Sequence, residues 1–159
     1  MSKVLSIDFG LKRIGFAVGN PQLGVANPIA PIIYKDFRQV IAHIQYLMTD
    51  YDVSRIVIGY PVNMDGSRCP MTQHVEHFTQ RLKKSLAPFD AIEYVDERLS
   101  SLEADEELKA ITPNPKKRKV LLDSMAAVIL LNRYMESAEN SHYRYNRYDS
   151  DDTDDSDET

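Results

Sequence analysis

The sequence predicts an α/β protein built on a mixed five-stranded sheet, in which a three-stranded antiparallel meander continues into parallel strands and helices flank both faces. Strand-like segments joined by tight turns come first, and helical and strand-like segments alternate after them. A meander followed by such alternation is typical of a mixed sheet covered on both sides. The 159 residues correspond to one domain, since domains usually contain about 100–200 residues.

The meander is expected at the start of the chain. Residues 3–9 form an apolar strand, residues 10–12 contain a glycine turn, and residues 13–18 form a second strand. Because the turn is short, the two strands run antiparallel. Residues 29–34 are a third strand. Pro31 within it indicates an edge or bulge position, because proline cannot donate a ladder hydrogen bond.

A helix and a buried strand are expected next. Asp36 is a favourable N-cap, and the apolar residues after it recur at helical spacing: Phe37, Val40, Ile41, Ile44, Leu47 and Met48. This period predicts an amphipathic helix. Residues 55–60 are a short, nearly continuous apolar run before Pro61, which is typical of a strand buried on both faces. The following loop contains a turn signal at Asp65-Gly66.

The second half of the chain continues the alternation. A helix is expected between Pro70 and Pro88, with its apolar stripe formed by Val75, Phe78, Leu82 and Leu86. His74 and His77 on this helix lack a third metal ligand, so we interpret them as part of a solvated helix face. The remaining elements are a strand, a short helix opened by a capping box, and a long last helix: residues 91–97, Ser100 with Glu103, and residues 116–137.

The charge of the chain is unevenly distributed. The formal net charge is −5, yet residues 149–159 contain seven acidic residues and no basic residue. The remaining 148 residues therefore carry 17 acidic against 19 basic residues, so net charge does not disfavour an anionic partner. An acidic block without apolar residues cannot pack. We predict a folded domain at residues 1–139 and a disordered acidic tail at residues 140–159.

Composition excludes several classes of protein. The single cysteine, Cys69, cannot form an internal disulfide and excludes a cysteine-rich zinc module. The longest apolar stretch, residues 120–131, is interrupted by Asp123 and Ser124, and it falls short of the ~18 apolar residues of a membrane span. The first residues lack the apolar region of a signal peptide. We expect a cytoplasmic protein with no membrane partner.

Three acidic positions are not explained by packing alone. Asp8 ends the first strand before a glycine turn, where it either caps the turn or serves a site. Glu97 follows Asp96 at a strand end, and one of the two either caps the next segment or pairs with Arg98. Helical spacing puts Asp123 on the apolar face of the last helix. An unpaired buried carboxylate costs several kcal/mol, so Asp123 needs a cation or a hydrogen-bond donor.

Strand ends and a helix face from distant parts of a chain can converge at one sheet edge, where ligands bind in α/β proteins. Three carboxylates there would offer hard oxygen ligands to one or two Mg²⁺ or Mn²⁺ ions. Two such ions ~4 Å apart stabilise both oxygens that exchange during phosphodiester hydrolysis. Ala126 and Ala127 are either ordinary helix formers or small residues that let the last helix approach the sheet. The alternative for Asp123 is a salt bridge to Arg98 or Lys12.

Four segments carry a family resemblance, in the order Ile7 to Val18, Ile58 to Ser67, Val95 to Ser100, and Lys119 to Ala127. They resemble the motifs of the YqgF (RuvX) family, whose members are described as pre-16S ribosomal RNA nucleases or Holliday junction resolvases and have a ribonuclease H-like fold. The match extends over about residues 3–136. Because four motifs occur in the family's order, the resemblance is far more specific than any single motif.

The resemblance implies a two-metal-ion endonuclease that depends on Mg²⁺ or Mn²⁺, with Asp8, Glu97 and Asp123 as catalytic and metal-binding residues. It favours Glu97 over Asp96, a choice that strand alternation cannot make without the register. The implied task is 5′-end processing of pre-16S ribosomal RNA during ribosome biogenesis. The alternatives are a Holliday junction resolvase acting on branched DNA and an inactive nucleic-acid-binding module, with the chain acting as a monomer or a homodimer.

Two further comparisons qualify this expectation. Gly19-Asn20-Pro21 stands where the family commonly has Ser-Asp-Pro, so an accessory acidic residue is missing. An actin-like phosphotransferase also carries an Asp-x-Gly pattern in its phosphate loop, but such proteins close two lobes around their nucleotide. This chain has room for one lobe, so we favour the nuclease.

Basic residues adjoin each of the three acidic positions. Lys12 and Arg13 follow the first strand, Arg98 follows the second acidic position, and Lys119 closes a basic run before the third. Phosphate contacts of this kind supply affinity and little sequence preference. Asn63 either hydrogen-bonds a phosphate or ribose, or it stabilises a turn. We expect these five residues to contact structured RNA or branched DNA.

Overall fold

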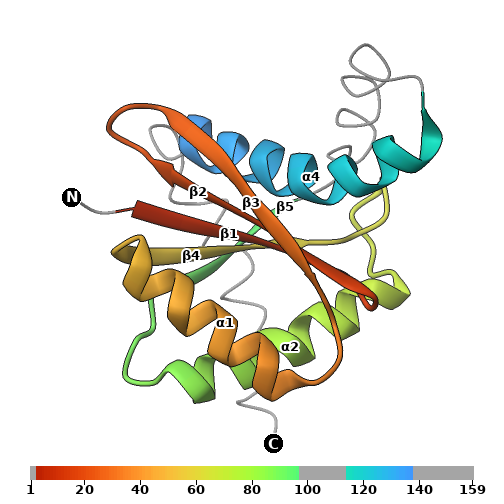
Figure 1. Cartoon of the computed structure of the whole chain (residues 1–159). Coiled ribbons are helices and arrows are strands. Elements are labelled where there is room, and N and C mark those ends of the chain that lie inside the picture. Colours follow the sequence, from red (N-terminus) through yellow and green to blue (C-terminus); the bar gives the residue numbers. More distant parts are fainter. Residues whose placement is uncertain (1–2, 97–113, 138–159) are drawn as a thin grey trace, which may run out of the picture.

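The computed structural model describes residues 3–96 and 114–137, and for residues 117–124 the backbone alone. The elements follow the predicted order (Figure 1): β1 (Lys3–Phe9), β2 (Arg13–Asn20), β3 (Val25–Ile33), α1 (Phe37–Asp50), β4 (Val53–Tyr60), α2 (Pro70–Leu86), β5 (Ile92–Asp96) and α4 (Pro115–Ser137). The expected short helix at Ser100 and Glu103 and the expected acidic tail lie outside the described residues.

The five strands form one mixed sheet in the order β3-β2-β1-β4-β5. β2 pairs antiparallel with β1 and β3, whereas β4 pairs parallel with β1 and β5 pairs parallel with β4. The C-terminal ends of β1, β4 and β5 therefore lie at one edge of the sheet. The predicted meander with its parallel continuation is confirmed.

Helices cover both faces of this sheet, as predicted. Figure 1 shows α4 crossing one face, while α1 and α2 lie against the other. We refer to these as the α4 face and the α1/α2 face. Within the described residues, none of the helices is both long and apolar enough to cross a membrane.

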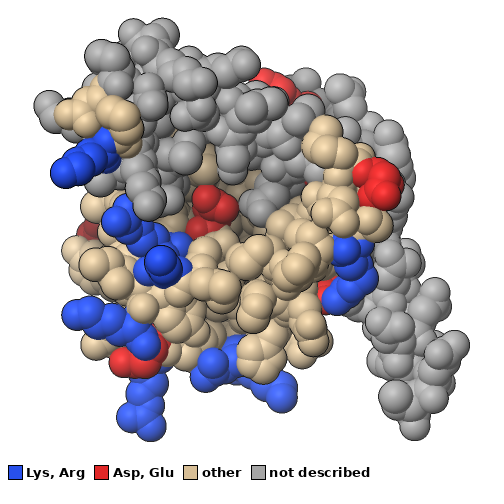
Figure 2. Space-filling view, turned by 90° about the vertical axis from the view of Figure 1, so that its right-hand side faces the viewer, with Lys and Arg blue, Asp and Glu red and all other residues tan. Residues whose placement is uncertain are grey.

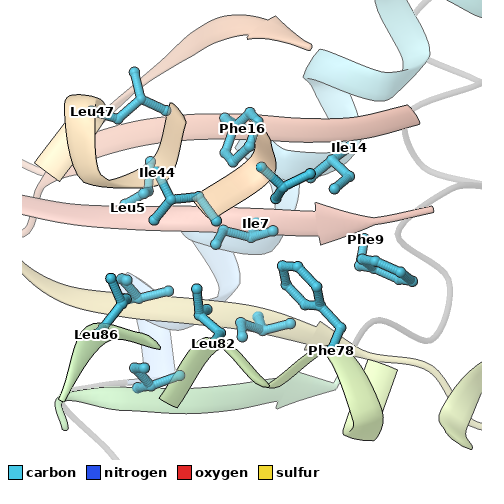
Figure 3. Packing of buried hydrophobic residues seen from close by; sticks show 14 of the residues in the cluster. Leu5, Ile7, Phe9, Ile14, Phe16, Ile44, Leu47, Phe78, Leu82 and Leu86 are labelled. Atoms are coloured by element: carbon cyan, nitrogen blue, oxygen red, sulfur yellow. The ribbon is translucent and has the colours of Figure 1, made fainter. Parts of the chain in front are cut away.

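The α1/α2 face holds the larger apolar cluster. β1 and β2 direct large side chains toward the two helices, and Figure 3 shows them interdigitating with Ile44 and Leu47 of α1 and Phe78, Leu82 and Leu86 of α2. Burial of each large apolar side chain contributes about 1.5–3 kcal/mol. The helical stripes predicted from spacing are therefore the ones that stabilise the fold.

The β2–β3 hairpin is longer than the sequence predicts. β2 continues to Asn20, whose carbonyl accepts the N–H groups of Leu23 (3.1 Å) and Gly24 (2.9 Å). Gly24 has a φ of 67°, which favours glycine. β3 then begins at Val25 and passes through Pro28. Pairing with β2 extends this strand over residues whose intrinsic propensity opposes it.

The predicted edge position of Pro31 is confirmed, because β3 is the outermost strand on its side. The pairing of β2 with β3 shifts between Ile14 and Phe16. As a result, Ala30 and Pro31 both lie opposite Gly15, which is the geometry of a β-bulge.

The helix starts follow local capping rules. Asp36 caps α1, because its Oδ1 accepts the N–H of Gln39 at 3.0 Å. Before α4, Asn114 Oδ1 accepts the N–H of Lys116 at 3.0 Å. Each bond satisfies one N–H that the first helical turn leaves without a partner.

Candidate active site at the end of strand β1

Asp8 is the next-to-last residue of β1 and is half-buried. Side chains alternate across a strand. Leu5, Ile7 and Phe9 belong to the cluster on the α1/α2 face, whereas Val4 packs with α4. Asp8 has the same parity as Val4, so its carboxylate lies on the α4 face at the edge where the parallel strands end.

Ser6 attaches α4 to this strand. Its Oγ donates a buried hydrogen bond of 2.7 Å to the carbonyl of Ala127. Figure 1 shows that α4 begins on the side where β1 ends. Two residues along β1 cover about 6.6 Å, and four residues back along α4 cover about 6 Å. The helical turn that contains Asp123 is therefore level with Asp8.

A second contact supports this alignment. Gly19 pairs with Val4, and a Cβ at Gly19 would lie 2.8 Å from a methyl group of Leu131. Leu131 follows Ala127 by one helical turn, and Val4 precedes Ser6 by two residues. The helix and the strand therefore stay aligned over this step of two strand residues and four helix residues.

Small residues allow α4 to come this close. On the α4 face β2 presents Gly15, Ala17 and Gly19, and from the helix Ala126 and Ala127 are buried against the sheet. The interpretation of the two alanines as residues that let the helix approach is favoured. Gly15 is the partner of Asp8 on β1 and places no side chain beside that carboxylate.

The register of β5 assigns Asp96 to one face of the sheet. Tyr94 belongs to the α1/α2 cluster and Val95 to the α4 cluster. By alternation Asp96 faces the α1/α2 side, on the opposite face from Asp8. Asp96 also accepts a hydrogen bond at its main-chain oxygen from Arg133 Nη1 (3.5 Å).

Two of the predicted phosphate contacts adjoin Asp8. Arg13 is half-buried at the start of β2, and its parity with Gly15 puts it on the α4 face. Lys12 is exposed in the preceding turn, where its carbonyl accepts the N–H of Tyr34 at 2.8 Å. Figure 2, which views the side on which β1 ends and α4 begins, shows acidic atoms in a hollow near its centre, with Lys and Arg atoms to the left and right of this hollow.

Asn63 lies in a well-formed turn. Its Nδ2 donates to Ser67 Oγ (2.9 Å) and to the carbonyl of Arg68 (3.3 Å), and its main-chain N–H donates to the Ser67 carbonyl (2.8 Å). Asp65 Oδ1 accepts the N–H of Ser67 at 2.9 Å. These bonds favour the turn interpretation of Asn63 over a direct contact to phosphate.

The side chains of the other predicted site residues are not described by the structure. Glu97 and Arg98 lie outside the described residues, and Asp123 and Lys119 lie in the part of α4 described by its backbone alone. Among the described side chains, no three His, Cys, Asp or Glu residues are grouped as a metal site. Glu97 and Asp123 are not among these side chains, so the predicted triad stays a prediction.

A polar network that the sequence does not reveal lies beyond the end of β4. Tyr60 donates its hydroxyl to Glu76 Oε2 at 2.9 Å, and Arg68 binds the same carboxylate with both terminal nitrogens. Burial acts to raise the pKa of the Glu76 carboxyl, but the hydrogen bonds from Arg68 and Tyr60 outweigh it and lower that pKa. Burial and the bond to Glu76 raise the pKa of Tyr60. The network fixes the loop after β4 to α2.

Comparison with protein families matches residues 2–137 to the family described as "RuvX: Holliday junction resolvase". Relatives similar in sequence bear the name "Putative pre-16S rRNA nuclease". One from Ruminiclostridium cellulolyticum is 33% identical over 135 residues, covering 84% of this chain and 94% of the relative. Another from Sulfurihydrogenibium sp. is 34% identical over 149 residues, covering 91% and 100%.

Comparison with solved structures supports the fold. Thermus thermophilus RuvC in complex with a Holliday junction substrate matches with a TM-score of 0.52 at 12% identity, covering 86% of this chain and 96% of that one. The fowlpox virus Holliday junction resolvase matches with a TM-score of 0.50 at 17% identity, covering 85% and 99%. At these identities the likeness concerns the fold alone, and it confirms the expected ribonuclease H-like architecture.

Proposed function

Because this chain belongs to the RuvX (YqgF) family, we propose that it is a metal-dependent endonuclease that hydrolyses phosphodiester bonds in the 5′-end processing of pre-16S ribosomal RNA. The name shared by its relatives, which it matches over nearly their whole length, supports this substrate.

The observation that carries the proposal is the position of Asp8. It is the acidic residue at the end of β1, on the face along which α4 is held by the bond from Ser6 to Ala127. That bond brings the turn of Asp123 level with it. The two residues are 115 positions apart in the sequence, and a salt-bridge or capping role for Asp8 alone gives no reason for this convergence.

The register also supports Glu97 as the third acidic residue. Asp96 has the parity of the α1/α2 face, so a strand continued by one residue would direct residue 97 toward the α4 face. We therefore propose that Asp8, Glu97 and Asp123 act together, and that Asp96 has no part in the reaction.

The donor set suits Mg²⁺ or Mn²⁺, because carboxylate oxygens are the ligands that these hard cations prefer. Gly15 leaves the space beside Asp8 without a side chain. When bound, such ions supply charge stabilisation at the attacking and leaving oxygens of a phosphodiester. The three carboxylates would hold them, and one or two ions could be accommodated by this set.

The basic residues would orient the substrate. Arg13 lies on the same face as Asp8, and Lys12 is exposed in the adjoining turn, so both can contact a phosphate next to the scissile bond. We assign the same task to Arg98 and Lys119, which adjoin the other two acidic residues in sequence. Asn63 would act indirectly, by holding the loop after β4 in its turn.

Cleavage of a precursor RNA that contains the 5′ end of 16S ribosomal RNA tests the proposal. Asp8→Asn should lower the rate at least about a thousandfold, since loss of several kcal/mol of charge stabilisation corresponds to this factor. Glu97→Gln and Asp123→Asn should have comparable effects. Asp96→Asn is the matched control and should keep the wild-type rate within about twofold.

Two measurements accompany this assay. Removal of divalent ions with a chelator should stop cleavage, and Mg²⁺ or Mn²⁺ should restore it. The thermal midpoint of Asp8→Asn should be unchanged or raised, because a like-charge repulsion is relieved. Retained cleavage in Asp8→Asn would refute its catalytic role.

A four-way DNA junction tests the second candidate function, which the fold of the solved resolvases favours. A resolvase acts on a two-fold symmetric substrate and is expected to be a dimer. Faster cleavage of the junction than of the precursor RNA, together with a dimeric mass on the junction, would replace the RNA substrate by branched DNA. Binding without cleavage of either substrate would indicate an inactive module.

A further inference from the structure

A pocket of about 220 Å³ opens on the α1/α2 side of the same strand end. Its lining comes from four parts of the chain: Phe9 of β1, Leu11 of the following turn, Tyr34 and Phe37 of the segment that leads into α1, and one side of α2 with His74, His77, Phe78 and Arg81. None of these eight residues is acidic. Phe9 directly follows Asp8, so the pocket and the proposed catalytic carboxylate lie on opposite faces of one strand end.

The floor of the pocket is aromatic. Phe9 stacks on Phe78 with ring centres 4.6 Å apart, and it meets Tyr34 edge to face at 5.8 Å. Phe37 meets Phe78 edge to face at 6.0 Å. Tyr34 and Phe37 are only half-buried, so a flat ring entering the pocket can contact their exposed parts.

One guanidinium and two imidazole groups lie at the rim of the pocket. His74, His77 and Arg81 are exposed on one side of α2, at spacings of three and four residues that bring them together on a helix. The guanidinium carbon of Arg81 lies 3.8 Å from the ring centre of Phe37. Arg81 is therefore held at the boundary between the aromatic floor and solvent, where its N–H donors can reach an anion.

We propose that this pocket binds one unpaired nucleotide of the substrate strand, with its base on the aromatic floor and its phosphate at Arg81, His74 and His77. Base stacking on aromatic side chains combined with basic groups is how proteins hold single-stranded nucleic acid. The volume of about 220 Å³ lies below the ~300–1,000 Å³ of ordinary small-molecule pockets, which suits one ring system with its sugar and phosphate outside.

The position of the pocket favours a nucleotide in a strand over a free one. The pocket holds the base and leaves the sugar and phosphate at its rim. Leu11, which is 55% exposed, lines the pocket and directly precedes Lys12 in the turn between β1 and β2. A strand passing over this turn would reach the end of β1 from the pocket. The inference therefore rests on the proposed function, because it assigns the pocket to the substrate of that site.

Binding of a fluorescent single-stranded oligoribonucleotide of about ten nucleotides, a length within known site sizes, tests the proposal. The full chain carries Asp8→Asn to prevent cleavage, and divalent ions are omitted. Arg81→Gln and Tyr34→Leu should each raise the Kd about tenfold, and Arg81→Lys should recover part of the loss. Lys84→Gln on the same helix and Tyr46→Leu on α1 are matched controls and should change the Kd less than twofold.

Histidine NMR signals supply a local readout. The imidazole signals of His74 and His77 should shift on addition of the oligonucleotide, while that of His43, which lies outside the pocket lining, should not. Equal effects of Arg81→Gln and Lys84→Gln, or unshifted His74 and His77 signals, would overturn the proposal. Uridine monophosphate binding as tightly as the oligonucleotide would also overturn it, since the ligand would then be a free nucleotide.

These results separate the pocket from the proposed nuclease. If wild-type protein cleaves precursor RNA and Arg81→Gln binds the oligonucleotide normally, the pocket assignment fails and the nuclease stands. If no precursor RNA is cut but binding depends on Arg81 and shifts His74 and His77, the nuclease fails and nucleotide binding at the pocket stands.

Discussion

On the α1/α2 face the sheet meets its helices through large apolar side chains, whereas on the α4 face it meets the helix at close range through small ones. Ser6 reaches the main chain of Ala127, and Gly19 lies against Leu131. β1 serves both faces, because alternate residues point to opposite sides. The α1/α2 face thus supplies most of the buried apolar volume, and the α4 face aligns a strand and a helix that both carry acidic residues.

The largest expected loss of stability comes from a substitution on the α1/α2 face. Ile7→Ala removes a fully buried side chain of β1 and should lower the free energy of unfolding by about 2–5 kcal/mol. Urea denaturation measures this. The comparison predicts that Asp8→Asn, one residue away on the other face, causes no such loss. A similar loss of unfolding free energy in both variants would show that the two faces do not differ in their contribution to stability.

The next effect concerns the close approach of α4. Gly19→Ala would place a Cβ 2.8 Å from both the Leu131 side chain and the carbonyl oxygen of Val25, and the carbonyl cannot move aside alone. Overpacking of this kind costs about 1–3 kcal/mol. The cleavage rate should fall by more than the loss of folded protein accounts for, because the substitution displaces α4 from the sheet. The exposed neighbour Gln22 provides the control variant Gln22→Ala, which should change neither quantity.

A smaller effect is expected at Ser6. Ser6→Ala removes the side-chain hydrogen bond to the carbonyl of Ala127, which lies within α4, at a cost of about 0.5–1.5 kcal/mol. Thermal unfolding gives the stability change, and cleavage assays well below the midpoint give the effect on alignment. Ser54→Ala is a matched control, since its exposed hydroxyl bonds the Lys3 carbonyl at 3.4 Å. Equal losses in the two variants would contradict the alignment role of Ser6.

The smallest effect lies in the network beyond β4. The folded state lowers the pKa of Glu76 from its usual value of 4.5, so this group stabilises the fold above that value, and the contribution is lost as the pH falls through the lowered pKa. Glu76→Gln should remove this pH dependence at a cost near 1 kcal/mol at neutral pH. Acid titration of unfolding free energy measures it. Parallel wild-type and variant curves would show that Glu76 is not linked to folding.

Local patterns in the sequence predict most of the fold. The helical stripes of α1 and α2, the cap at Asp36 and the edge position of Pro31 each depend on neighbouring residues, and each is confirmed. The length of β3 is underestimated, because Pro28 and its neighbours oppose strand structure until pairing with β2 compensates them. The sheet order adds information that no local pattern contains.

The candidate site is less accessible to sequence reasoning. Asp8 is found from its place before a glycine turn, but the side to which Asp96 points depends on the register of β5 relative to both clusters. The role of Ser6 has no sequence signal, since a serine in an apolar strand predicts no particular partner. His74 and His77, interpreted as a solvated helix face, line a pocket because residues from β1 and α1 approach them in space.

The bulge and the prolines of β3 bear on self-association. An outer strand with unpaired N–H groups invites a second sheet to join it. Pro28 and Pro31 each remove one such donor, and the bulge at Ala30 and Pro31 bends the edge strand at that point. A homodimer of this chain is therefore not expected to form by continuing the sheet across β3 into a neighbour.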